Sequence, residues 1–115
     1  MSTSCKLVFG YKDHCDDFII TDVYYRHYDG YMEAVLPLLK EHKADITTMN
    51  MVAEFNGHKW EKLDSVYDGV SGVDYIYYID SSDKSEIKCS VIGIDMDFVL
   101  KYGVDNYKVM KNLIL

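Results

Sequence analysis

Four runs of β-branched and aromatic residues constrain the fold of this chain more than any other feature. The first two, CKLVFGY (5–11) and DFIITDVYYRHY (17–28), are separated by the polar segment KDHCD. The other two, DYIYYID (74–80) and EIKCSVIGID (86–95), are separated by SSDKS. Such runs with short polar segments between them are typical of antiparallel strands joined by turns. The sequence therefore predicts two hairpins.

Alternation along these strands assigns their side chains to two faces, because successive strand residues point to opposite sides of a sheet. In the fourth run Ile87, Cys89 and Val91 share one face, as expected for a half-buried strand. The second run is different. One of its faces would carry Ile19, Val23, Tyr25 and His27, and the other Phe18, Ile20, Asp22, Tyr24, Arg26 and Tyr28. Both faces are mixed, so the alternation leaves open which one is buried.

Three short helices are predicted between and after the strands. The apolar spacing of residues 35–39 indicates the first, and Pro37 places its regular start near residues 34–36, since proline is tolerated only in a first turn. Asp45 is a candidate N-cap for a second helix that ends at Asn56-Gly57. Asp95 is a candidate N-cap for a third helix, through Tyr102, that stops at Gly103.

Two segments remain, and they complete the predicted organisation. Residues 58–73 have repeated glycine breaks and read mainly as a long connection, and the C-terminal VDNYKVMKNLIL ends apolar, which favours packing on the core or on another subunit. The predicted fold is a single α+β domain over residues 1–115. It has a small, mostly antiparallel sheet of about four strands, made of two hairpins, packed against two or three short helices.

Charge and composition exclude several classes of function. With 12 basic and 19 acidic residues the formal net charge is −7, which repels a nucleic-acid backbone and favours a basic partner surface. Apolar runs such as AVLPLL are far shorter than the roughly 20 residues that cross a bilayer. The chain has three cysteines without a C-x-x-C pair, and its N-terminal segment lacks a signal pattern. These two features predict a cytoplasmic protein with free thiols.

The densest set of chemically active side chains is YYRHYDGY, residues 24–31. Arg26 could hold a carboxylate or phosphate, the tyrosines could stack on a flat ring, and His27 with Asp29 could transfer a proton. The structural alternative is that the tyrosines cover the sheet, Arg26 pairs with Asp22 or Asp29, and Asp29-Gly30 is a turn. The candidate ligand- or partner-binding residues are Tyr24, Tyr25, Arg26, His27, Tyr28, Asp29, Tyr31 and Trp60.

Other chemistry has weaker support in the sequence. Trp60, in the long connection, is either an anchor for a partner or a plug over the core. The histidines and cysteines have no zinc-binding spacing, and no local signature marks a cysteine as a nucleophile. DGVSG lacks the spacing and the lysine of a phosphate-binding loop. We therefore expect no metal site and no cofactor, and we name no catalytic residue.

The same segment carries a resemblance to a group of short proteins of phages and mobile elements. That group has a Tyr-Arg-His-Trp-Asp-Gly-Tyr-Pro signature ahead of a helix and a later Tyr-(Ile/Leu)-Tyr-x-Ile-Asp strand. Residues 25–27 and 29–31 match the signature, and residues 75–77, 79 and 80 match the strand. Tyr28 stands where the group has tryptophan, and Met32 where it has proline. The resemblance implies a phage or mobile-element origin and no particular activity.

Three hypotheses on function follow. The first is a small phage-type protein that acts by binding in the host cytoplasm, where it inhibits or sequesters a host factor, such as a component of a defence system. The second is a protein that binds a small nucleotide-like ligand, with Arg26 on a phosphate and Tyr24, Tyr28 or Trp60 on the base. The third, ranked last, is a hydrolase that uses His27 and Asp29, and a non-enzymatic role is preferred over it. A homo-oligomer is a further hypothesis, since strands rich in tyrosine and an apolar C-terminus can leave a patch that a second copy covers.

Overall fold

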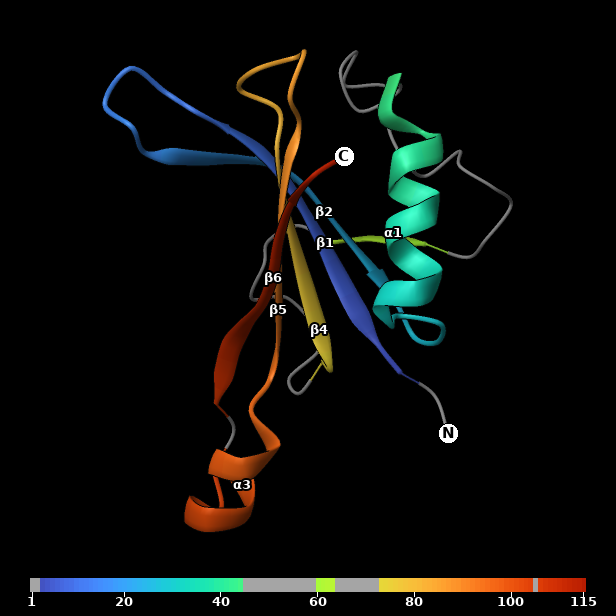
Figure 1. The fold of residues 1–115 in the computed structure, drawn as a ribbon, viewed down its shortest axis with the longest axis vertical. Helices are drawn as coiled ribbons and strands as arrows, with labels where there is room; N and C mark the ends of the chain where they lie inside the picture. The colour runs from blue at the N-terminus through green and yellow to red at the C-terminus, as the bar shows by residue number, and fades with distance from the viewer. Residues whose placement is uncertain (1–2, 45–59, 64–72, 105) are drawn as a thin grey trace.

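The computed structural model describes residues 3–44, 60–63, 73–104 and 106–115. Its described strands form one six-stranded sheet in the order β3-β2-β1-β4-β5-β6, crossed on one side by helix α1 (Figure 1). The strands are β1 (Cys5–Lys12), β2 (Phe18–Arg26), β3 (Glu61–Leu63), β4 (Tyr75–Asp80), β5 (Lys88–Ile94) and β6 (Tyr107–Ile114). The described helices are α1 (Met32–Glu41) and α3 (Met96–Tyr102).

Both predicted hairpins are confirmed. β1 pairs antiparallel with β2, and β4 pairs antiparallel with β5. The two hairpins are joined through β1 and β4, which run parallel from Cys5 opposite Tyr75 to Gly10 opposite Asp80. A parallel pair needs a crossover connection, and α1 lies in the stretch of chain that leads from the first hairpin to the second.

The predicted sheet of about four mostly antiparallel strands is wrong, because the sheet has six strands and is mixed. One extra strand, β3, lies in the segment read as a connection, where three residues pair with β2. The other, β6, is the C-terminal segment, which pairs antiparallel with β5 along its length. The two or three predicted helices correspond to two described ones. The predicted helix that starts at Asp45 falls outside the described residues.

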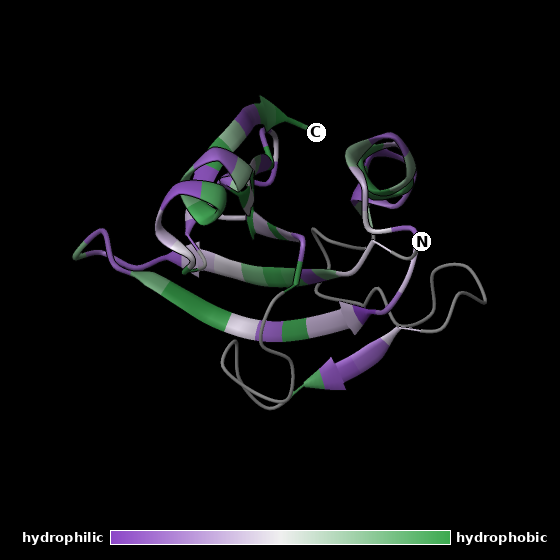
Figure 2. Cartoon of the chain, turned by 90° about the horizontal axis from the view of Figure 1, so that it is seen from below, coloured by the Kyte–Doolittle hydropathy of each residue, from purple (hydrophilic) through white to green (hydrophobic). Residues whose placement is uncertain are grey.

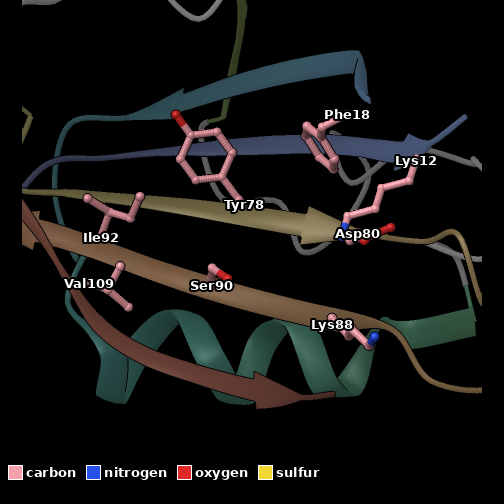
Figure 3. Close-up of a pocket in the computed structure, with 8 residues that line it drawn as sticks. All are labelled: Lys12, Phe18, Tyr78, Asp80, Lys88, Ser90, Ile92 and Val109. Atoms are coloured by element: carbon pink, nitrogen blue, oxygen red, sulfur yellow. The ribbon is translucent and has the colours of Figure 1, made fainter. Parts of the chain in front are cut away.

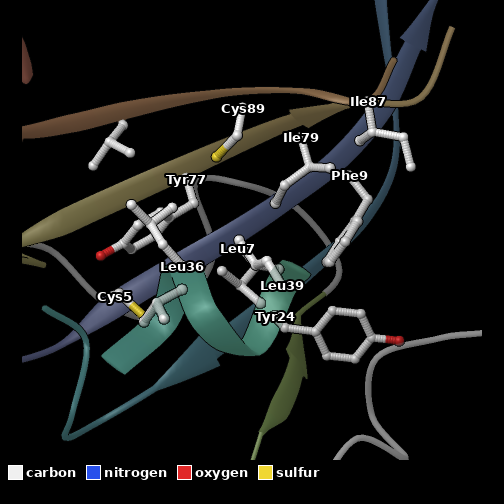
Figure 4. Packing of buried hydrophobic residues seen from close by; sticks show 12 residues of the cluster. Cys5, Leu7, Phe9, Tyr24, Leu36, Leu39, Tyr77, Ile79, Ile87 and Cys89 are labelled. Atoms are coloured by element: carbon white, nitrogen blue, oxygen red, sulfur yellow. The ribbon is translucent and has the colours of Figure 1, made fainter. Parts of the chain in front are cut away.

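The hydrophobic core lies between α1 and the face of the sheet that α1 covers (Figures 2 and 4). Val35, Leu36 and Leu39 of α1 meet alternate side chains of the central strands. The remaining members of this cluster lie in strands, except Ile87, which directly precedes β5. They are Cys5, Leu7, Phe9, Tyr24, Tyr77, Ile79, Ile87, Cys89 and Val91. As predicted, Ile87, Cys89 and Val91 share the buried face. Leu113 and Leu115 also pack against this cluster, so the apolar C-terminus contributes to the core.

A bulge in the first hairpin explains why both faces of β2 look mixed in the sequence. Phe9 lies opposite Asp22, but Gly10 lies opposite Ile20, so Thr21 is an extra residue in β2. A bulge reverses the alternation of the strand beyond it. Tyr24 therefore packs in the core, whereas Phe18, six residues earlier, contacts Tyr78 on the opposite face with ring centroids 6.3 Å apart. The core-facing side of β2 is the one that carries Asp22, Tyr24 and Arg26.

The two described helices differ in how they begin and in what they contact. α1 begins at Met32, two residues before the earliest predicted start, and accommodates Pro37 on its exposed side. α3 begins and ends as predicted. The Asp95 carboxylate accepts a hydrogen bond from the Phe98 amide at 3.3 Å, and Gly103 ends the helix in the left-handed conformation with φ of 72°. α3 has no buried residue and projects from the end of the sheet away from α1 (Figure 1).

Candidate functional site

Residues 26–31 form a tightly held loop between β2 and α1, which we call the signature loop. Arg26 is 2% exposed, and its guanidinium donates from Nε to the Tyr28 carbonyl at 2.8 Å and from Nη2 to the Asp29 carbonyl at 2.6 Å. The Tyr77 hydroxyl donates to the Gly30 carbonyl at 2.6 Å. The Tyr31 carbonyl accepts from the first turn of α1. Four consecutive carbonyls of the loop are thus fixed by hydrogen bonds.

Asp29 and Gly30 have separate roles in this loop. Asp29 adopts a left-handed conformation with φ of 56°, which aspartate tolerates better than most residues. Gly30 does not need positive φ. Its amide donates to the Thr3 carbonyl at 2.7 Å, and a Cβ at Gly30 would lie 2.7 Å from the backbone carbon of Ser4. The glycine is therefore required by the close approach of the loop to the start of β1.

The buried charge of Arg26 is balanced by dipoles and by an aromatic ring. Its guanidinium carbon lies 4.6 Å from the centroid of the Trp60 ring, a cation–π arrangement. Nη1 is buried and has no hydrogen-bond partner in the described part of the chain. Of the two carboxylates expected to pair with Arg26, that of Asp22 instead pairs with Lys62 at 3.3 Å, and Asp29 offers its main-chain carbonyl. Arg26 thus holds the loop from inside the protein.

The predicted site residues divide into a buried and an exposed set. Tyr24 is 1% exposed and packs edge-to-face on Phe9, and the lack of solvent around it raises the pKa of its hydroxyl. Outside lie His27, Tyr28, Asp29 and Tyr31, with Tyr28 and Tyr31 each about two fifths exposed. Tyr25 and Trp60 are half-buried, and Trp60 also packs against the core. Both readings of Trp60 are therefore compatible with its position.

The exposed side chains beside the loop surround a shallow hollow of about 280 Å³. We call it the loop hollow, and it is lined by Tyr25, His27, Tyr28, Trp60 and Glu61. The Tyr25 hydroxyl and His27 Nδ1 are hydrogen-bonded at 2.8 Å. Burial raises the pKa of Tyr25, and nearby Glu61 adds to the effect, so this phenol stays protonated and is suited to donate. Among the described residues, no hydrogen bond joins His27 to Asp29.

A second and larger hollow lies on the face of the sheet opposite α1, and the sequence analysis did not predict it. It has a volume of about 470 Å³, within the range of small-molecule sites (Figure 3). Apolar side chains of four strands line it, with two lysines and an aspartate at one end. Its residues are Lys12, Phe18, Tyr78, Asp80, Lys88, Ser90, Ile92 and Val109. The bulge at Thr21 brings Phe18 to this face, and for that reason a simple alternation of β2 could not find it.

The thiols are not arranged for catalysis. Burial raises the pKa of Cys5 to about 12, with Arg26 acting weakly in the opposite direction, and burial alone raises that of Cys89 to about 12. Both therefore remain protonated at neutral pH, and the third, Cys15, is exposed in the first hairpin turn. No three histidine, cysteine or acidic side chains of the described ranges come together as metal ligands.

Comparisons with known proteins add no family. No model of a known protein family matches the chain, and neither the curated proteins nor the solved structures include a significant match. None of the described helices is long and apolar enough to span a membrane. The class that the fold and the site define is a small α+β protein with a six-stranded mixed sheet and a rigid, tyrosine-rich loop at the start of its helix.

Proposed function

We propose that this protein acts by binding a protein partner in the cytoplasm of a bacterial host, and that the loop hollow and the adjacent exposed tyrosines form the contact surface. The observation that carries the proposal is the fixed backbone of the signature loop. Arg26 and Tyr77 anchor three successive carbonyls, so the side chains of His27, Tyr28 and Tyr31 are presented on a preformed frame. A surface that is ordered before binding loses less conformational entropy when a partner docks.

The residue types of this surface also suit a protein partner. Tyrosine, tryptophan and histidine combine a flat apolar body with a polar group, and tyrosine and tryptophan are enriched at protein interfaces. Asp29 and Glu61 are exposed beside them, in a chain of net charge −7. The partner surface we propose is therefore basic, with an apolar side chain that enters the loop hollow. Opposite charge on the two surfaces speeds their encounter.

The cellular role that we attach to this surface is inhibition or sequestration of a host factor, such as a component of a defence system. The resemblance of residues 25–31 to the signature of short phage proteins supports it, together with the small size and acidity of the chain. Catalysis has less support, because the two buried thiols are protonated and His27 pairs with Tyr25 instead of Asp29. Binding is therefore the role that the site supports best.

The test is affinity capture from a bacterial lysate with three forms of the protein. The wild type should enrich a specific protein, and Tyr28→Ala should reduce its recovery at least about tenfold, as expected for an interface tyrosine. Tyr11→Ala is the matched control, because Tyr11 is 41% exposed and Tyr28 43%, and Tyr11 lies in the first hairpin away from the loop. Equal loss with both variants, or no enriched protein with the wild type, would refute the proposal.

A small nucleotide-like ligand is a second candidate, and the hollow on the open sheet face favours it. There Phe18 and Tyr78 offer aromatic faces for a base, and Lys12 and Lys88 offer cations for a phosphate. A thermal-shift panel of nucleotides tests this directly, since a ligand at about 100 times its dissociation constant adds roughly 2.7 kcal/mol of stability. Lys88→Gln should abolish the shift, and Lys84→Gln, in the exposed turn of the second hairpin, should preserve it.

A further inference from the structure

The exposed apolar side chains of this protein are concentrated at the edge of the sheet that lies farthest from β2 and β3 in strand order. Twelve large hydrophobic side chains of the described residues are exposed, and seven of them lie between residues 96 and 114. These seven are Met96, Leu100, Tyr102, Val104, Val109, Met110 and Ile114. Patches of this kind on a soluble protein mark interaction sites. We call these residues, with the strand and helix that carry them, the α3–β6 surface.

The elements of the α3–β6 surface have little cover in the part of the chain that the structure describes. α3 has no buried residue, and Leu100 on it is 80% exposed. β6 is the last strand of the sheet, and five consecutive residues, 108–112, are exposed. Among the described residues no strand pairs with the outer edge of β6, so a further strand could pair along residues 108–112.

The charge of this segment points to a particular occupant. Residues 95–115 contain three aspartates and three lysines, so they are neutral, and residues 1–94 carry the whole net charge of −7. A basic partner would be attracted to the other surfaces more than to this one. A two-fold contact brings the same patch of both copies together, so a patch that is neutral overall avoids the net repulsion that a charged patch would meet in its own copy.

We propose that the α3–β6 surface binds a second copy of this chain, with β6 of each copy antiparallel to the other and the apolar side chains of α3 and β6 packed across a two-fold axis. Lys108 is already paired with Asp95 of its own chain at 3.6 Å. Lys111 on β6 and Asp97 on α3 are exposed charges of opposite sign. In the proposed dimer, Lys111 of one copy and Asp97 of the other lie in the same interface.

The dimer leaves the proposed partner-binding surface free. The loop hollow lies by β2 and β3, at the opposite end of the strand order from β6. A two-fold dimer through β6 therefore presents two loop hollows at its outer ends. A partner with two sites, or two linked partners, would bind such a dimer more tightly than a single copy. The dimer does not depend on the proposed function, and either can fail alone.

The experiment is sedimentation velocity of the purified full chain over a dilution series. The wild type should show a dimer that dissociates on dilution. Leu100→Asp and Val109→Asp should each raise the dimer dissociation constant at least about tenfold, because they place a charge in an apolar contact. Ile20→Asp is the matched control: Ile20 is also an exposed aliphatic side chain of a strand, 42% against 60% for Val109, but it lies in β2.

Two further measurements test the dimer without the aspartate variants. Lys111→Glu changes an exposed charge without removing apolar packing, so it should weaken the dimer even if the aspartate variants unfold. Hydrogen exchange should show amides of residues 107–114 becoming protected as the concentration rises. A wild type that is monomeric throughout the series overturns the proposal. So does a dimer whose dissociation constant rises as much with Ile20→Asp, or whose protection appears outside α3 and β6.

Discussion

The hydroxyl of Tyr77 gives the sharpest test of the idea that the signature loop is a fixed frame. Tyr77 is fully buried in β4, and its hydroxyl donates to the Gly30 carbonyl, 47 residues away in the chain, at 2.6 Å. Burial raises the pKa of this phenol above its usual value, so the hydroxyl is protonated at neutral pH and can donate. Tyr77→Phe keeps the ring in the core and removes only this bond.

The expected loss of stability in Tyr77→Phe follows from the hydrogen bond that the Gly30 carbonyl loses. Gly30 is itself buried, so its carbonyl cannot exchange the lost donor for bulk water. Removal of one partner from a buried pair costs about 1–3 kcal/mol. Against a total stability of roughly 6–17 kcal/mol for a chain of this length, this is a measurable fraction. We expect a lower midpoint of urea unfolding with an unchanged m-value, because the same surface is exposed on unfolding.

The assay needs a control for the loss of a hydroxyl as such. Tyr11→Phe removes the same group from an exposed side chain, and surface substitutions of this kind change stability by less than about 0.5 kcal/mol. If Tyr77→Phe is as stable as Tyr11→Phe, the hydrogen bond does not hold the loop and the reasoning fails. A reduced midpoint together with weaker partner capture would connect the frame to the proposed binding surface.

Three further predictions test other parts of the structure. Gly30→Ala should destabilise the protein by about 3 kcal/mol or more in urea unfolding, because its methyl group would meet the Ser4 backbone at 2.7 Å; a stable variant would mean that the loop can move away from β1. In the native protein a thiol reagent should label Cys15 alone, and all three cysteines after unfolding; fast native labelling of Cys5 or Cys89 would contradict their burial. These two thiols have a pKa near 9 when unfolded and about 12 when folded, so the unfolded state loses protons first. The free energy of unfolding should therefore be undiminished below pH 9 and fall above it by up to about 1.4 kcal/mol per pH unit for each thiol, and an equal urea midpoint at pH about 8 and about 10.5 would refute this.

The sequence predicted those elements whose local signals match their final environment. The pairs β1–β2 and β4–β5 are runs of β-branched and aromatic residues with polar turns between them, and α3 has an aspartate and a glycine at its two ends. β6 could not be found in this way, because residues 108–112 are exposed on both sides and a strand without a buried face shows no period of two. β3 has only three residues, too few for any periodicity. The parallel pairing of β1 with β4 joins segments 70 residues apart and has no local signal.

The candidate site shows the same division between local and long-range causes. A turn at Asp29-Gly30 was one of the two readings of this segment, and Asp29 has the positive φ that such pairs tolerate. That Arg26 faces inward depends on its pairing opposite Cys5 in β1, and that Gly30 must lack a side chain depends on Thr3 and Ser4, at the start of the chain. The hydroxyl that holds Gly30 belongs to Tyr77, in the second matching segment of the resemblance. No window of sequence around the loop contains these contacts.

That last contact gives the paired signature a physical reading. Cys5 lies opposite Arg26 in β2 and opposite Tyr75 in β4, so β1 is the common neighbour of both matching segments. The first segment supplies the loop and Arg26 beneath it, and the second supplies the hydroxyl that fixes Gly30. The side chains of Arg26 and Tyr77 and the missing side chain of Gly30 hold the loop backbone in place. The side chains of His27 and Tyr28 do not take part in these contacts. If the loop is a frame for binding, substitution of the first three should lower stability and binding together, and substitution of His27 or Tyr28 should lower binding alone.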